Sequence, residues 1–375
     1  MNIIVAPDGF KDSLEAKAVC NAMLNGIAAF NPQAKAYAIY ASDGGDGFLN
    51  AVKHYKPELE TVHTVTQDPL GRSILADYLW DTKNFIAYIE LAAASGIELL
   101  SSQERQVMDT STYGTGLQIQ NAIARGAEKI YVGLGGSATN DAATGLAAAL
   151  GYVFKDSYGN PIVPCGKKLI DIQSIFCPNS IPEKVKVIAV NDVQNPLYGA
   201  QGAAFTYAAQ KGASTTEIDQ LDQGLRALNN VVLNDLKRDV AHLLGAGAAG
   251  GTGYGLKVFL NAEFISGTHF ILGLSDFFDR IDSQQIDLIL TGEGCIDNQT
   301  ANGKLIHGLI GIGTARNIPV MAVCGKLNLS PDQVKNLGLK DAVELYQATK
   351  PKDYSYTHAA RLVVERTTQM LSKHY

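Results

Sequence analysis

An apolar run that breaks into glycines and then into a helix-forming segment limits the folds open to this chain more than any other feature. Residues Ile130–Val132 form such a run, and it is followed by Gly133-Leu134-Gly135-Gly136-Ser137-Ala138-Thr139-Asn140-Asp141 and an alanine-rich segment up to Leu150. Apolar and aromatic residues, then glycines, then alanines predict a strand, a tight loop and a helix. The chain is therefore expected to contain the strand–helix units of an α/β protein.

The loop after Ile130–Val132 could bind an anion through backbone N–H groups at the start of the predicted helix. Gly135 and Gly136 would let the backbone approach a phosphate closely, and three polar side chains could donate to it or cap the helix, namely Ser137, Thr139 and Asn140. The loop lacks the Gly-Lys-Ser or Gly-Lys-Thr ending of a P-loop and the glycine spacing of a dinucleotide fingerprint. An ordinary strand-to-helix turn explains these residues equally well, so both interpretations stay open.

Four other predicted strands also end in loops that carry acids. The predicted strands are residues 3–6, 36–41, 185–190 and 287–290. The polar residues that follow them are Asp8 and Lys11, then Asp43 and Asp46, then Asp192, and finally Glu293 and Asp297 after Gly292. Ligands of open parallel sheets bind at the carboxyl ends of the strands, which favours a shared site for these residues.

Each of these polar residues has a functional and a plainer interpretation. A lysine can pair with phosphate, and an aspartate can accept a proton or hold a metal ion. The same residues can be solvated loop charges, Asx turns or first-turn acids that favour the helix dipole. Ser13 is predicted to cap a helix that extends from about Glu15 to Phe30.

Residues 61–66, 74–80 and 85–91 change the pattern, because they are short alternating strands typical of antiparallel hairpins. Arg72, just after the first turn, could clamp a substrate carboxylate or be an exposed turn arginine. Glu90 closes the third strand, and either a ligand-facing or a plain surface position fits it. The glycine run Gly245–Gly255 permits close packing or contact with a nucleotide, and a flexible linker is the alternative.

The length of 375 residues exceeds what one core usually supports, so two domains are expected. We predict a discontinuous Rossmann-like parallel-sheet domain, residues 1–63 and 283–375. A second, inserted α/β domain with a mixed sheet would span residues 64–282. The active site would lie in the cleft between the two domains.

Composition narrows the class of protein further. The net charge is −6 and no run of basic residues occurs, which argues against a nucleic-acid surface. The five cysteines form no Cys-x-x-Cys pair and indicate reduced thiols. With no basic leader and no apolar run of membrane-spanning length, we expect a cytoplasmic enzyme without a membrane or nucleic-acid partner. The oligomeric state stays open, with a homo-oligomer as one option.

Eight segments in order resemble those of the class I glycerate kinase family, the bacterial glycerate 2-kinases. They are Ala6–Leu14, Asp43–Gly47, Asp68–Arg72, Gly135–Asp141, Asp192 with Asn195–Leu197, Gln210–Ala213, Gly245–Gly251, and Thr291–Gly294 with Ile296-Asp297. The resemblance covers nearly the whole chain. It implies phosphorylation of D-glycerate that depends on ATP and Mg²⁺, at the 2-hydroxyl or, as the alternative, with 3-phosphoglycerate as product.

The resemblance leads us to expect particular roles at matched positions. Lys11 would neutralise the transferred group, and Asp8 or Asp192 would polarise the glycerate hydroxyl. Nucleotide contacts are expected from Gly135, Gly136, Ser137, Thr139, Asn140, Gly292 and Glu293. Substrate contacts are expected from Asp43, Asp46 and Arg72, and Mg²⁺ contacts from Asp192 and Asp297.

This chain departs from the family pattern at four positions. Gly9 replaces a usual serine, Asp46 a glutamate, Gln194 a threonine and Cys295 an arginine. If that arginine neutralises phosphate, Lys304 or Lys326 must replace it here. A hydroxy-acid dehydrogenase is a rival interpretation that lacks the dinucleotide fingerprint, and a non-catalytic protein that binds small acids is another.

Overall fold

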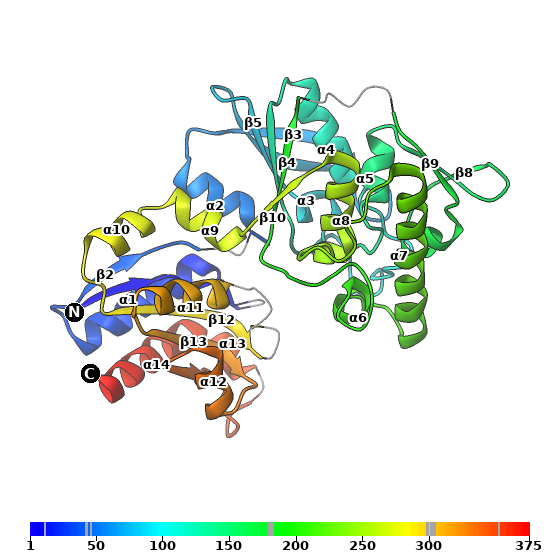
Figure 1. Cartoon of the computed structure of the whole chain (residues 1–375). Helices are drawn as coiled ribbons and strands as arrows, with labels where there is room; N and C mark the ends of the chain where they lie inside the picture. The colour runs from blue at the N-terminus through cyan, green and yellow to red at the C-terminus, as the bar shows by residue number, and fades with distance from the viewer. Residues whose placement is uncertain are drawn as a thin grey trace. The chain divides into compact units, whose positions relative to one another are not determined.

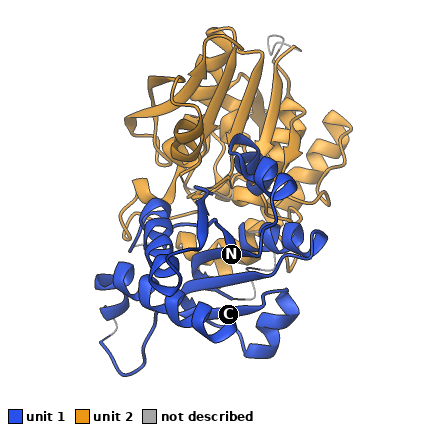
Figure 2. Cartoon of the chain, turned by 90° about the vertical axis from the view of Figure 1, so that its left-hand side faces the viewer, with its two compact units in different colours: residues 1–43, 268–375 blue, residues 44–267 orange. Residues whose placement is uncertain are grey.

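The computed structural model describes residues 1–10, 13–41, 44–45, 47–178, 184–297, 300, 305–351 and 353–375. The chain forms two compact units, which are coloured separately in Figure 2. The first unit contains residues 1–43 and 268–375, and the second, residues 44–267, is inserted into it. The expected arrangement of a discontinuous unit with an inserted one is therefore present.

The first unit is built on a five-stranded sheet in which every strand pair is parallel. Its strands are β1 (Asn2–Val5), β2 (Lys35–Ala38), β12 (Leu288–Ile296), β13 (Val320–Leu327) and β14 (Asp341–Glu344). They lie in the order β14-β13-β12-β1-β2, and Figure 1 labels β2, β12 and β13. The chain leaves β1 towards one edge and β12 towards the other, so a topological switch point lies between these two strands. The predicted Rossmann-like parallel sheet is confirmed.

Alternating side chains of β1 point to opposite faces of this sheet, as the two-residue period of a strand requires. Ile3 and Val5 pack with helices α1 (Ala16–Phe30) and α14 (Ala359–His374). Ile4 and Ala6 pack on the other face. The helices on that face are α9 (Gly267–Leu274), α10 (Phe277–Ser283), α11 (Leu305–Ala315) and α12 (Pro331–Leu337). Two helical layers thus bury the sheet, and α13 (Tyr354–Thr357) precedes α14.

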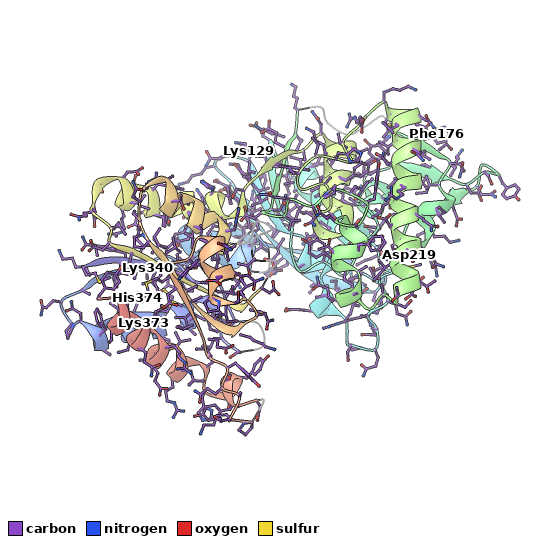
Figure 3. The ribbon with its side chains drawn as sticks, turned by 60° about the horizontal axis from the view of Figure 1, so that its bottom comes forward. Lys129, Phe176, Asp219, Lys340, Lys373 and His374 are labelled. Atoms are coloured by element: carbon purple, nitrogen blue, oxygen red, sulfur yellow. The ribbon has the colours of Figure 1, made fainter. Side chains whose placement is uncertain are left out.

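The end of α14 is tied to the edge strand β14. The Oδ2 atom of Asp341 accepts hydrogen bonds from Lys373 Nζ at 2.8 Å and from His374 Nε2 at 2.6 Å. The ammonium group of Lys340 lies 4.3 Å from the ring centroid of Tyr375. Figure 3 shows Lys340, Lys373 and His374 grouped at this end of the helix.

The second unit contains a six-stranded mixed sheet with the order β11-β10-β6-β5-β4-β3. Its strands are β3 (Glu60–Gln67), β4 (Ser73–Asp81), β5 (Ile86–Glu90), β6 (Lys129–Gly133), β10 (Lys186–Val190) and β11 (Glu263–Ile265). The first three pair antiparallel, as the hairpin pattern predicts, and β5, β6, β10 and β11 pair parallel. The predicted mixed sheet is confirmed.

Helices complete the second unit. They are α2 (Phe48–Tyr55), α3 (Ala92–Ser95), α4 (Tyr113–Ala124), α5 (Thr144–Ala149), α6 (Ala203–Tyr207), α7 (Thr215–Leu236) and α8 (Ala248–Leu260). Three short 3₁₀ segments join them, Ile97–Leu99, Gly166–Asp171 and Ala209–Lys211. Short strands β7 (Val153–Lys155), β8 (Pro161–Ile162) and β9 (Ser174–Phe176) form a separate antiparallel sheet that the sequence pattern did not predict.

The boundaries between the two compact units lie at 43/44 and 267/268. They differ from the predicted boundaries, 63/64 and 282/283. Residues 44–63 group with the second unit, where Glu90 at the end of β5 accepts hydrogen bonds from the backbone of Gly47 and Leu49. Residues 268–282 group with the first unit, because Phe277 and Ile281 of α10 pack into its core.

Two local findings complete the fold. The prediction that Ser13 caps α1 is wrong, because Glu15 occupies the N-cap position of this helix. The hydroxyl of Ser13 instead donates to the carbonyl oxygen of Tyr356 at 3.3 Å. None of the helices in the described part of the chain combines the length and the apolar character that crossing a bilayer requires.

Candidate functional site

The carboxyl end of β1 lies beside the middle of β12 at the switch point of the first unit. The backbone N–H of Ala6 donates to Leu290 O at 2.9 Å, and that of Asp8 donates to Gly292 O at 2.8 Å. The hydroxyl of Thr291 donates back to Ala6 O at 2.8 Å. These bonds extend the parallel pairing beyond β1 and bring Asp8 next to Gly292, while a ligand at this strand edge stays a prediction.

Glu293 is a buried carboxylate within this edge. It is 6% exposed, and its Oε1 atom accepts a hydrogen bond from the hydroxyl of Thr300 at 2.5 Å. Thr300 also bonds the backbone of Asp297, since its N–H donates to Asp297 O and its hydroxyl accepts from Asp297 N. Thr300 therefore forms hydrogen bonds with two acids of the predicted site, Glu293 and Asp297.

Packing against the neighbouring strand excludes any side chain at Gly292. A Cβ atom at this position would lie 2.2 Å from the carbonyl oxygen of Val323 on the neighbouring strand. The expected nucleotide contact of Gly292 stays a prediction, and its small size is already required by the sheet.

Cys295, which stands where the family has a usual arginine, is half-buried and accepts a contact from the side-chain amide of Asn328 at 3.3 Å. Its register partner on β13 is Lys326, whose side chain is exposed. Among the residues that the structure describes, Lys326 is therefore a positively charged neighbour of Cys295 in the sheet. Lys11, Asp43, Asp46 and Lys304 lie outside the described residues.

In the second unit, the ends of the parallel strands also meet at one edge. Leu134 N donates to Val190 O at 2.9 Å, and Asn191 N donates to Ile265 O at 3.1 Å. Asp192 follows directly, and its Oδ1 accepts the hydroxyl proton of Ser266 at 2.6 Å. The loop after β6, Asp192 and Ser266 therefore lie at the same edge, the carboxyl edge of the second sheet.

The loop after β6 is not the start of a helix, because α5 begins only at Thr144 and has six residues. The predicted capping roles of Ser137, Thr139 and Asn140 are therefore wrong. The hydroxyls of Ser137 and Thr139 lie 2.9 Å apart, and Thr139 N donates to Ser137 Oγ at 3.0 Å. Gly136 has φ +59°, and its carbonyl accepts from Ile97 N at 2.7 Å. The loop is thus fixed by its own side chains and by the segment after β5.

A buried carboxylate holds the far end of this loop. Asp141 accepts hydrogen bonds from the backbone and hydroxyl of Thr112, at 2.8 and 2.9 Å, and from the backbone of Ala143 and Gly145. Burial raises the pKa of the Asp141 carboxyl, and these donors oppose the shift. Ala142 and Ala143 both have left-handed backbone, with φ of 50° and 56°. Such strain persists only where the surroundings enforce it.

The glycine run Gly245–Gly255 packs against the same loop and is not a linker. A Cβ atom at Gly250 would lie 1.9 Å from Thr139 O, and one at Gly255 would lie 2.1 Å from Ala142 O. Gly250 O also accepts a hydrogen bond from Ala142 N at 3.1 Å. Close backbone packing, one of the two functional interpretations of the run, is therefore present.

Two buried side chains lie at this edge, and the sequence assigned a role to Asn140 but none to Lys211. Lys211 is 4% exposed, and its Nζ donates to Thr139 O at 2.7 Å. Burial lowers the pKa of Lys211 to about 7, against an opposing effect of the charge on Asp141. The side-chain amide of Asn140 is buried and has no hydrogen-bond partner among the described residues. The small residues around Lys211 are the one weak sequence sign of its burial.

Arg72 is held by two carboxylates. Its Nε donates to Asp68 Oδ2 and its Nη1 to Glu104 Oε1, each at 2.5 Å, and its Nη2 reaches Leu99 O at 3.4 Å. The side chain therefore bridges the turn after β3 and the segment after the first 3₁₀ turn. A contact with substrate stays a prediction and would require Arg72 to share or exchange these partners.

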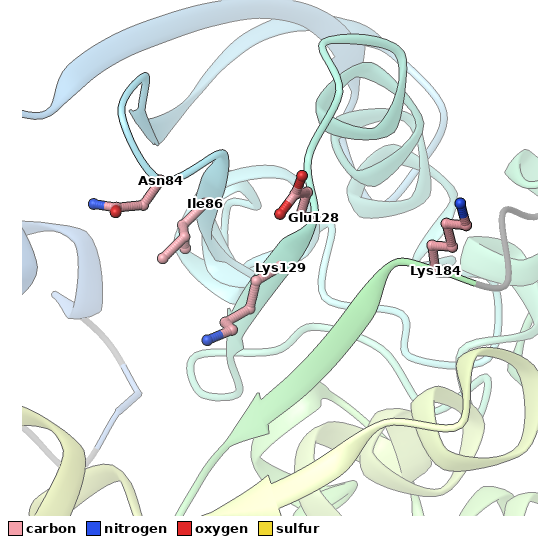
Figure 4. Close-up of a pocket in the computed structure, with 5 residues that line it drawn as sticks. All are labelled: Asn84, Ile86, Glu128, Lys129 and Lys184. Carbon is pink, nitrogen blue, oxygen red and sulfur yellow. The ribbon is translucent and has the colours of Figure 1, made fainter.

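A surface hollow of about 590 Å³ lies away from these residues. It is lined by Asn84, Ile86, Glu128, Lys129 and Lys184, as Figure 4 shows. These residues lie at or near the amino ends of β5, β6 and β10. The hollow is therefore at the opposite edge of the sheet from Asp192 and the loop after β6, and we do not assign the site to it.

Comparison with known proteins agrees with the resemblance. Residues 3–374 match the glycerate kinase family. A glycerate kinase of Halalkalibacterium halodurans is 37% identical over 92% of this chain and 90% of its own. A glycerate 2-kinase of Escherichia coli is 36% identical over the same shares. A crystal structure from Salmonella typhimurium LT2, of a protein assigned as glycerate kinase 2, is 32% identical with a TM-score of 0.76 and covers 100% of this chain and 98% of that one. The chain belongs to the glycerate kinase family.

Proposed function

We propose that this protein transfers the γ-phosphoryl group of ATP to the 2-hydroxyl of D-glycerate and produces 2-phosphoglycerate. The observation that carries the proposal is the gathering of polar groups at the carboxyl ends of parallel strands in both units of a glycerate kinase family member. The name of the E. coli relative, glycerate 2-kinase, supports the choice of hydroxyl. None of the five cysteines forms a disulfide, and this fits the cytoplasmic location that we propose.

Phosphoryl transfer depends mainly on positioning and on neutralising charge, so the proposal divides these tasks among the strand-end residues. Asp8 or Asp192 polarises the glycerate hydroxyl, and Lys11 neutralises charge on the transferred group. The nucleotide is bound by Gly135, Gly136, Ser137, Thr139, Asn140, Gly292 and Glu293. Glycerate is bound by Asp43, Asp46 and Arg72.

In the proposal, a magnesium ion arrives with the nucleotide. Among them, no three His, Cys, Asp or Glu side chains are grouped as a metal cage. Mg²⁺ at nucleotide sites usually needs only one or two carboxylates, with phosphate oxygens and water as its other ligands. Asp192 and Asp297 would supply these carboxylates in the proposal. The ion, when bound, neutralises charge on the phosphate oxygens.

A coupled assay tests the reaction. Purified protein with ATP, Mg²⁺ and D-glycerate should feed enolase directly, because enolase consumes 2-phosphoglycerate and not 3-phosphoglycerate. Product that reaches enolase only after addition of phosphoglycerate mutase would change the assignment to the 3-hydroxyl. Failure to form ADP in the presence of glycerate would overturn the proposed function.

Asp192→Asn tests whether the reaction needs the carboxylate of Asp192, because asparagine has nearly the same shape but no negative charge. We expect kcat to fall about 10²- to 10⁴-fold, the range typical of losing a group that polarises a reacting hydroxyl. The matched control is Asp219→Asn on the exposed side of α7, which Figure 3 labels. The control should retain wild-type kcat. Equal rates in the two variants would remove Asp192 from the reaction.

A further inference from the structure

Lys211 is a buried basic residue to which the proposed function assigns no role. It ends the 3₁₀ segment Ala209–Lys211, is 4% exposed, and bonds a carbonyl oxygen 72 residues away in sequence. Burying an ammonium group is unfavourable unless its surroundings compensate for the lost hydration. A fully apolar side chain of the same length would fill the space at lower cost, so stability alone does not explain a lysine here.

The acceptor of Lys211 belongs to the most constrained part of the second unit. Thr139 O lies between Lys211 Nζ, at 2.7 Å, and the backbone of Gly250, where no Cβ atom fits. Two residues further along, Asp141 is bonded by four donors of Thr112, Ala143 and Gly145. The residues from Thr139 to Asp141 are thus held from three directions.

Asn140 lies between these two fixed points. The carbonyl group of Thr139 and the N–H of Asn140 belong to one rigid peptide plane, so a bond to the carbonyl also sets the direction of that N–H and the start of the Asn140 side chain. The buried amide of Asn140 has no partner among the described residues, and a native group of this kind needs an explanation such as a ligand.

We propose that Lys211 is a positioning residue, which holds the Thr139 carbonyl so that Asn140 and the preceding loop are correctly oriented for the phosphates of the nucleotide. This inference rests on the proposed function for its ligand. Lys211 acts through the peptide plane of Thr139 and Asn140 and does not itself contact the reacting atoms.

Lys211→Met separates positioning from stability. Methionine keeps the length of the side chain but removes the donor and the buried charge. We expect an apparent Tm close to that of wild type, because removing the desolvated ammonium offsets the loss of its hydrogen bond to Thr139 O. We also expect the amides of residues 140–145 to exchange about tenfold faster in hydrogen-exchange mass spectrometry, since the loop loses one of its fixed points.

We expect the substitution to change kcat and the KM for ATP, and to leave the KM for D-glycerate nearly unchanged. In Lys211→Met, kcat should fall about 10- to 100-fold and the KM for ATP should rise, while the KM for D-glycerate stays within about twofold. A merely structural role would lower Tm and reduce kcat through loss of folded protein, without changing either KM. The control is Lys168→Met, which removes an exposed lysine of the same unit that pairs with Asp171.

The two proposals fail in different ways. If wild-type protein does not phosphorylate glycerate, the proposed function fails, and hydrogen exchange still decides the role of Lys211 in the loop. Unchanged exchange of residues 140–145 in Lys211→Met would overturn the positioning role, whatever the reaction. A lower Tm with unchanged KM values would overturn it as well.

Discussion

The two units place polar groups at the ends of parallel strands by different means. In the first unit, neighbouring strands fix the position of the polar residue. Asp8 N donates to Gly292 O, and this bond directly continues the pairing between β1 and β12. In the second unit, the loop after β6 leaves the sheet and is held by side chains and by other loops, with Asp141, Lys211 and Gly250 as its supports.

This difference predicts where substitutions act at a distance. At the edge of the first unit, the sheet itself fixes the backbone, so a substitution should matter mainly when it removes an acid. At the edge of the second unit, the loop geometry depends on buried residues that contact no ligand in the proposal. Substitutions of residues that contact no ligand should therefore affect activity more in the second unit than in the first.

The largest effect is expected for Gly250→Ala, which attacks a support of the second unit directly. The new Cβ atom would overlap the Thr139 carbonyl, and φ is +67°, so either the loop or α8 must move. We expect a loss of about 3–5 kcal/mol, measured by urea unfolding. Gly159→Ala is the control, because φ is +82° there but no atom lies within 4 Å of the added Cβ. It should cost about 1–2 kcal/mol, and equal losses would show that backbone strain alone is responsible.

A smaller but still large effect is expected for Asp141→Asn. The amide NH₂ group would face either the N–H of Ala143, at the Oδ1 position, or the donors of Thr112 and Gly145, at the Oδ2 position, so at least one buried hydrogen bond becomes a donor–donor contact. We expect a loss of about 2–4 kcal/mol in denaturant unfolding, together with lower activity. The control Asp156→Asn alters a half-buried turn acid that accepts solvent-exposed hydrogen bonds from the backbone of Tyr158 and Asn160. If the two variants lose the same stability, Asp141 is not a special support.

Sequence patterns predicted the elements of both sheets well. The apolar run at residues 3–6 corresponds to β1, and the alternating runs at 61–66, 74–80 and 85–91 correspond to β3, β4 and β5. Burial on both faces or on one face is encoded in local periodicity, so these strands could be identified without tertiary information. The three short strands between residues 153 and 176 have too few residues to show a period.

The supports of the second-unit loop could not be predicted in the same way. Lys211 and Thr139 are 72 residues apart, and nothing local indicates that an ammonium and a carbonyl group will meet. The hydroxyls of Ser137 and Thr139 satisfied the pattern for helix caps, but they bond within the loop because left-handed Ala142 and Ala143 delay the helix to Thr144. Contacts of this kind are fixed by tertiary packing.

The smallest effect is expected in the first unit, for Asp341→Asn. Partial burial raises the pKa of the Asp341 carboxyl, but hydrogen bonds from Lys373 and His374 outweigh this effect, so the pKa lies below its usual value. A lowered folded-state pKa contributes stability that is present above the unfolded value near 4 and is lost as the pH falls through the folded value.

Asp341→Asn should therefore cost about 0.5–1 kcal/mol at pH 7, since Lys373 is exposed and screened, and the difference from wild type should shrink as the pH falls below about 4. Urea unfolding at several pH values measures this, with Glu365→Gln as a control, because that exposed α14 acid pairs with Arg361 only at 3.5 Å. The kinetic constants of Asp341→Asn should equal those of wild type, because the tie lies at the amino end of β14, away from the carboxyl edge that carries Asp8 and Glu293. A kinetic defect in this variant would contradict the view that the first unit fixes its strand edge through the sheet alone.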